Sequence, residues 1–135
     1  PQLHRAEVPR GPEAKGPIDV TLTSFPDRIA SSAVSPDGST LVFLKDQGGD
    51  ENFQILRMPV AGGEPVIVIS APKVRHTQPV FEASFELKKK GRIAFTSNAR
   101  NGKDMDLYVG SVPREGGPQR VSVRDAWLQR CLALK

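Results

Sequence analysis

The chain passes twice through the same order of strand-like and turn-like segments. The first passage contains Thr40 to Lys45 (TLVFLK) and, after a polar loop and another apolar run, the pair Gly62-Gly63. The second contains Arg92 to Ser97 (RIAFTS) and, in the corresponding place, Gly116-Gly117. Branched and aromatic residues favour strands, and paired glycines supply the positive φ angles of tight hairpins. The repeat therefore predicts units of short antiparallel strands joined by turns.

The register of the repeat is constant over its central part. Phe43 and Phe95 lie 52 residues apart, and so do Ile55 and Leu107. A four-stranded antiparallel unit of about 50 residues has the size of a propeller blade. We therefore predict an all-β fold with two four-stranded antiparallel β-propeller blades. The propeller is incomplete, because a closed ring takes about four to eight blades.

The expected organisation has four parts. Residues 1–17 hold four prolines and two glycines without apolar periodicity, and they predict a flexible, disordered arm. Residues 18–76 form blade 1 and residues 77–123 form blade 2. Residues 124–135 form a tail in which Trp127 and its apolar neighbours have helical spacing, which is compatible with a short amphipathic helix.

Three local segments give further expectations. Pro65 to Ser70 (PVIVIS) has four consecutive apolar residues and predicts a strand that is covered on both faces. Ser35 to Gly38 (SPDG) predicts a tight turn. Glu82 to Gly91 (EASFELKKKG) replaces that turn in the second unit and is longer, which indicates an insertion or a damaged turn.

Composition and charge exclude several classes of protein. One cysteine cannot form an internal disulfide. The longest uncharged apolar stretch, around Pro65 to Pro72, is far shorter than the roughly 20 residues that span a bilayer, and Pro1 to Pro17 lacks a secretory signal. The net charge of +4 comes largely from Lys88–Lys90 and the C-terminal arginines, without interleaved exposed aromatics. We therefore expect no membrane span and no nucleic-acid binding.

Longer motifs resemble known families. Val34 to Phe43 (VSPDGSTLVF) resembles the opening of TolB-like propeller blades. Four further stretches are similar to the propeller of prolyl-oligopeptidase-type serine peptidases: Gly49 to Ile55, Met58 to Pro65, Arg92 to Asn98 and Asp104 to Val109. The likeness covers about residues 18–123. It implies a propeller that caps a separate α/β-hydrolase domain, screens substrates and forms part of the substrate-binding cavity.

Catalytic residues of such a peptidase are not found in the sequence. A nucleophile elbow needs Gly-x-Ser-x-Gly, and no serine has glycines at both required positions. His4 lies in the expected arm and His76 in the linker between the repeats, and neither has a nucleophile near it in the sequence. We therefore expect a chain that is not an enzyme by itself, with no catalytic residues.

Acidic pairs and clusters have structural and functional interpretations. Asp46, Asp50 and Glu51 are interpreted as part of a solvated hairpin loop, and cation binding is the alternative. Asp104 and Asp106 have strand spacing and are interpreted as polar residues between a loop and a strand, with a binding role as the alternative.

The remaining candidates are single residues. His76, next to Arg75, is interpreted as part of a surface linker; the alternative is a ligand-facing position at a propeller axis. Cys131 has no partners for zinc, which takes four ligands, and is interpreted as a free thiol. We expect no metal and no cofactor.

The function expected from these observations is that of a non-catalytic propeller fragment. It resembles the substrate-gating N-terminal domain of a prolyl-oligopeptidase-type peptidase. One alternative is a TolB-like propeller that acts as a protein-interaction module. Another is a small independent β-sandwich or barrel with Trp127 in its core. The expected partners are a protein or peptide, or further copies of the chain through open blade edges.

Overall fold

Every regular element that the structure describes is a β-strand. The computed structural model describes residues 2–7, 10–11, 18–85, 91–112 and 122–124. Its strands are β1 (His4–Glu7), β2 (Ile18–Thr21), β3 (Ile29–Val34), β4 (Thr40–Lys45), β5 (Gln54–Pro59), β6 (Val66–Ile69), β7 (His76–Phe81), β8 (Gly91–Ser97), β9 (Asp106–Val112) and β10 (Ser122–Arg124). All pairings are antiparallel. The prediction of an all-β, antiparallel chain is confirmed, and no helix among the described residues is long and apolar enough to cross a membrane.

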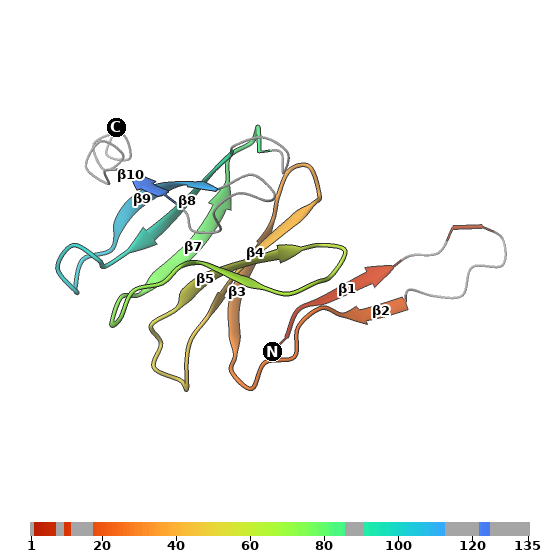
Figure 1. The fold of residues 1–135 in the computed structure, drawn as a ribbon, viewed down its shortest axis with the longest axis horizontal. Helices are drawn as coiled ribbons and strands as arrows, with labels where there is room; N and C mark the ends of the chain where they lie inside the picture. The colour runs from red at the N-terminus through yellow and green to blue at the C-terminus, as the bar shows by residue number, and fades with distance from the viewer. Residues whose placement is uncertain (1, 8–9, 12–17, 86–90, 113–121, 125–135) are drawn as a thin grey trace.

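The strands form two meanders and a separate hairpin (Figure 1). Sheet 1 has the order β3-β4-β5-β6. Sheet 2 contains β7, β8 and β9 in the same sequential order, and the three-residue β10 pairs with β9. The N-terminal hairpin, β1 with β2, is a two-stranded sheet of its own.

The turn between β3 and β4 forms where the sequence predicts it. The Gly38 amide donates to the Ser35 carbonyl at 2.9 Å, and Gly38 has a φ of 71°, which a residue without a Cβ adopts at no steric cost. The Asp37 carboxylate accepts from the Ser39 amide at 3.1 Å and from the Ser35 hydroxyl. These bonds fix the register in which Val34 pairs with Leu41.

Two hydrophobic clusters divide the molecule into three layers. The inner cluster lies between the two sheets and joins residues such as Val42 and Leu44 of β4 to Ile93 and Phe95 of β8. The outer cluster lies on the opposite face of sheet 1 and includes Phe43, with residues next to the hairpin packed against it. Figure 1 shows sheet 2 on the left of sheet 1 and the β1–β2 hairpin projecting to the right, and residues that flank the hairpin, Leu3, Leu22 and Phe25, pack on the outer cluster.

Over its described residues 2–7, the N-terminal segment departs from the expectation of a flexible, disordered arm over residues 1–17. His4–Glu7 form β1, which pairs with β2. Leu3 packs against the outer cluster, and the Gln2 side chain accepts from the Phe25 amide at 2.9 Å. These contacts anchor the segment, and they are invisible in the sequence because their partners lie about 20 residues away.

The expectation that Val66–Ile69 is covered on both faces is wrong. Ile67 is 51% exposed, because β6 is the edge strand of sheet 1 and the hairpin layer does not cover it. The strands that are covered on both faces are β4, in which Leu41 to Leu44 are all buried, and β5, in which Ile55 to Met58 are all buried.

The segment after β7 contributes to the core. Phe85 is 2% exposed and belongs to the inner cluster. Its ring meets that of Phe81 edge-on, with centroids 4.6 Å apart. Lys88–Lys90, which contribute to the net charge, and the helix-compatible tail with Trp127 and Cys131 lie outside the described residues.

Candidate functional site

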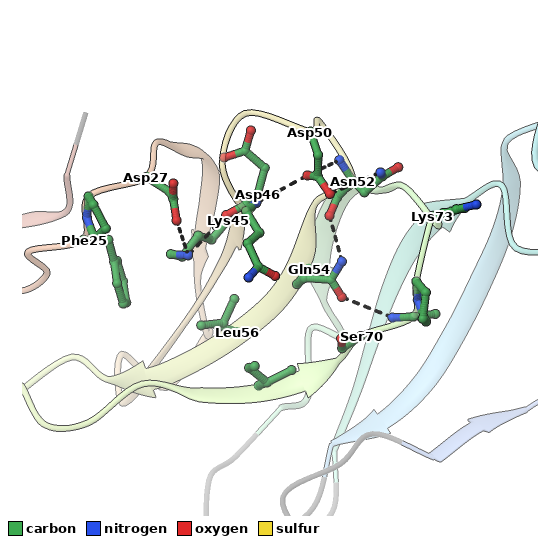
Figure 2. Close-up of a pocket in the computed structure, with 15 residues that line it drawn as sticks. Phe25, Asp27, Lys45, Asp46, Asp50, Asn52, Gln54, Leu56, Ser70 and Lys73 are labelled. Carbon is green, nitrogen blue, oxygen red and sulfur yellow. Dashed lines mark hydrogen bonds and ion pairs between the residues drawn. The ribbon is translucent and has the colours of Figure 1, made fainter.

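An open groove lies at one end of sheet 1, on the side that faces the hairpin layer (Figure 2). Its volume is about 510 Å³. Leu56 and Ile67, which are cross-strand partners on β5 and β6, form an apolar floor. Phe25 and the β4–β5 loop form one side, and residues after β6 form the other. The groove thus combines an apolar floor, in which Ile67 is exposed and Leu56 is buried, with walls from three connecting segments.

Lys45 and Asp27 form the charged part of the first wall. Lys45 Nζ lies 2.9 Å from Asp27 Oδ2 and 5.2 Å from the centre of the Phe25 ring. The hydrogen bond from Lys45, followed by that from the Gly48 amide, lowers the pKa of Asp27. Since both side chains are only about one-fifth exposed, the pair holds the segment before β3 against the end of β4.

Asp50 shapes the β4–β5 loop at the rim. Its Oδ1 accepts from the Asn52 amide at 3.0 Å and from the Gln47 amide at 3.3 Å. The bond from the Asn52 amide is the main cause of a lowered pKa for Asp50. Asp50 therefore stays ionised and stabilises the β4–β5 loop by binding its Gln47 and Asn52 amides.

Gln54 joins the two sides of the groove. Its Nε2 donates to the Asn52 carbonyl at 2.7 Å, and its Oε1 accepts from the Ala71 amide at 3.1 Å. One half-buried amide thus connects the β4–β5 loop to the segment after β6, as the dashed lines in Figure 2 show.

The acidic loop does not bring its three carboxylates together. Asp46 is buried, Asp50 caps the loop, and Glu51 reaches across to Arg75 at 2.9 Å. No group of three histidine, cysteine or acidic residues among the described residues is arranged to hold a metal ion. The geometry therefore favours a loop held by local bonds, although the burial of Asp46 departs from the expectation of a solvated loop.

Asp104 and Asp106 both bind Arg100. Arg100 Nη2 lies 3.0 Å from Asp104 Oδ2, and Arg100 Nε donates to Asp106. The pairing with Asp106 raises the pKa of Arg100. Asp106 is the first residue of β9 and Asp104 lies in the preceding turn, so the arrangement closes the β8–β9 connection, as the interpretation between loop and strand predicts.

His76 is a buried residue at the junction of the two sheets, and its interpretation as a surface linker is wrong. It is 3% exposed and its ring centre lies 5.9 Å from that of Phe95. Nδ1 donates to the Phe53 carbonyl oxygen at 2.7 Å; a carbonyl only accepts, so Nδ1 carries the proton. Burial lowers the pKa of His76, and the bond to Phe53 opposes this shift.

The hairpin contains a histidine, a carboxylate and a hydroxyl that do not make a catalytic triad. His4 Nδ1 lies 3.1 Å from Asp19 and 3.5 Å from Thr21 Oγ1. A triad needs the base to use one ring nitrogen for the nucleophile and the other for the carboxylate. Here both partners meet the same nitrogen, so the trio has the wrong geometry for nucleophilic catalysis.

The groove was not predicted from the sequence. Its parts come from three connections, and the segment of Phe25 and Asp27 carries no motif. The one available signal was Lys45, a cation at the end of an otherwise apolar strand, which needs a partner when it is largely buried. No family model, no curated protein and no solved structure matches the chain.

Proposed function

We propose that the chain is a non-catalytic binding module of the propeller type, and that its groove holds an extended peptide. In this proposal the two sheets are adjacent blades, similar to those in the substrate-gating domain of prolyl-oligopeptidase-type peptidases. The observation that carries it is the groove itself, in which the exposed Ile67 is framed by hydrogen-bonding groups at a loop end of sheet 1.

The direction in which the sheets stack supports the propeller part of the proposal. Phe43 of β4 faces the hairpin, and Phe95, its counterpart in β8, faces sheet 1. Each aromatic side chain thus points toward the layer that precedes its own sheet in the chain. Blades around an axis repeat in this head-to-tail way, whereas the two halves of a sandwich core present their inner faces to each other.

The chemistry of the groove supports the binding part. Ile67 and Leu56 offer an apolar surface to a side chain, and binding sites commonly combine such a surface with a few placed polar groups. Asn52 and Gln54 hold the rim through defined bonds.

The test is a titration of the isotope-labelled chain with blocked hexapeptides that contain one proline and one leucine, phenylalanine or lysine. We expect amide shifts confined to the groove, and the peptides should stay intact in mass spectrometry. Ile67→Asp should weaken binding about tenfold or more, because it places a charge on the apolar floor. Val34→Asp is the matched control, since Val34 is 55% exposed on sheet 1 and does not line the groove, and it should bind normally.

Three outcomes count against the proposal. Shifts outside the groove would place binding elsewhere. A complete absence of binding to all hexapeptides would remove the peptide function. A peptide-cleaving activity that co-purifies with the chain, and that the Ile67→Asp variant retains, would contradict the non-catalytic role.

A further inference from the structure

Sheet 2 has one face that no described layer covers. In β8 and β9, residues facing the inner cluster alternate with residues facing away from it. We call five neighbouring residues of this outward set the open face: Val80, Ala94, Thr96, Leu107 and Val109. Val80 is 58% exposed, and the other four are partly exposed. The open face is therefore an accessible, mostly apolar patch, and the polar residues Thr77, Arg92 and Ser111 border it on the same side of sheet 2.

The repeat relates the open face to a surface that is already an interface. Ala94 and Thr96 correspond to Val42 and Leu44 at the spacing of 52 residues. Val42 and Leu44 are buried in the inner cluster, where sheet 1 meets sheet 2. By the repeat, the open face of sheet 2 therefore corresponds to the face of sheet 1 on which sheet 2 packs.

The other end of the stack is already occupied. The corresponding outer cluster of sheet 1 is packed against Leu3, Leu22 and Phe25. The Arg5 guanidinium donates to the Val60 carbonyl at 2.9 Å and fastens the hairpin to sheet 1. A second copy therefore cannot add in the head-to-tail direction without displacing this layer, and the open face is left as the docking surface.

The charges beside the open face are self-complementary. Glu82 and Arg92 lie 2.6 Å apart and help to line a hollow of about 200 Å³ together with Val80 and Val109. Arg92 is more than half exposed. A surface that carries one cation and one anion beside an apolar patch matches a copy of itself turned by a twofold axis, because each charge then meets its opposite.

We propose that two copies of this chain bind each other through their open faces and form a closed, twofold-symmetric dimer. The face, and not the strand edges, is then the surface of self-association. Because the hairpin covers the opposite end, the assembly stops at two copies instead of growing into a fibre. This inference does not depend on peptide binding in the groove.

Sedimentation equilibrium of the full chain tests the proposal. We expect a reversible equilibrium between a 14.7 kDa monomer and a species of twice that mass. Val80→Asp should raise the dissociation constant of the dimer about tenfold or more, because it buries an unpaired charge. Val34→Asp is the matched control: Val34 is 55% exposed on sheet 1, and the dimer should persist.

Arg92→Glu provides a second variant on the exposed surface. It sets like charges against each other in the dimer and should also weaken it, and Glu82→Arg in the same chain should restore the association. Circular dichroism confirms that each variant is folded. A wild-type chain that stays monomeric at high concentration, or that forms open-ended polymers, would overturn the proposal. So would a dimer that resists Val80→Asp and dissociates in Ile67→Asp, since that result points to the edge of sheet 1.

Discussion

Phe43 and Phe95 hold the same position in two successive sheets, yet their side chains lie in different cores. Phe43 is fully buried in the outer cluster, with its ring centre 6.1 Å from that of Phe25. Phe95 lies in the inner cluster and stacks on Tyr108 at 5.7 Å. The 52-residue repeat therefore also repeats the direction in which equivalent side chains face, and the sheets stack head to tail.

Replacing Gly91 by alanine should destabilise the fold. A Cβ at this position would overlap the ring of Phe85, which is buried and held against Phe81. We expect a loss of about 1–3 kcal/mol in the free energy of unfolding, measured by urea denaturation. The control is the same change in a Phe85→Ala background, where the added methyl group has room. An equal cost in both backgrounds would show that the overlap is not the cause.

Stability should fall between neutral pH and about pH 5 because of His76. Burial lowers its pKa in the folded state below the ordinary value of 6.5, so the unfolded chain binds more protons than the folded chain in this range. The stabilisation is then present above pH 6.5 and is lost as the pH falls toward the folded-state pKa. Urea denaturation at several pH values measures this slope.

Two substitutions isolate the contribution of His76. His76→Phe keeps an aromatic ring next to Phe95 and should remove the slope between pH 7 and pH 5. His4→Gln changes the exposed histidine of the hairpin and should leave the slope intact. If the slope follows His4 instead, the burial of His76 is not its source.

Asp37→Ala should loosen the turn between β3 and β4. The carboxylate accepts hydrogen bonds from the hydroxyls of Ser35 and Ser39 and from the Ser39 amide. Their loss should cost about 1–2 kcal/mol in unfolding free energy. Asp37→Asn retains an acceptor oxygen and should cost less, so equal losses for the two variants would show that the carboxylate bonds do not hold the turn.

The strands of the repeat could be predicted from the sequence, whereas the N-terminal hairpin could not. Thr40 to Lys45 and Arg92 to Ser97 could be recognised from their branched residues and their fixed spacing, since these signals are local. The hairpin strand His4–Glu7 could not, because Gln2 and Leu3 are held by partners more than 19 residues away. Pro-rich composition indicated an irregular arm, and tertiary contacts overrode it.

Burial of single residues was equally hard to predict. His76 lies between two repeats in the sequence, which favours a surface linker, but β7 begins at this residue and turns the ring toward Phe95. Phe85 stood in a segment that breaks the repeat, yet its ring fills the space above Gly91. Both outcomes depend on how the two sheets meet, which is a property of packing rather than of sequence spacing.

The head-to-tail stacking of the sheets is tested most directly by nuclear Overhauser contacts of the two phenylalanine rings. In the isotope-labelled chain, we predict cross-peaks from Phe43 to Phe25, and from Phe95 to His76 and Tyr108, with none between Phe43 and Phe95. Cross-peaks between Phe43 and Phe95 would place both rings in one shared core, as in a sandwich of two facing sheets, and would contradict the account.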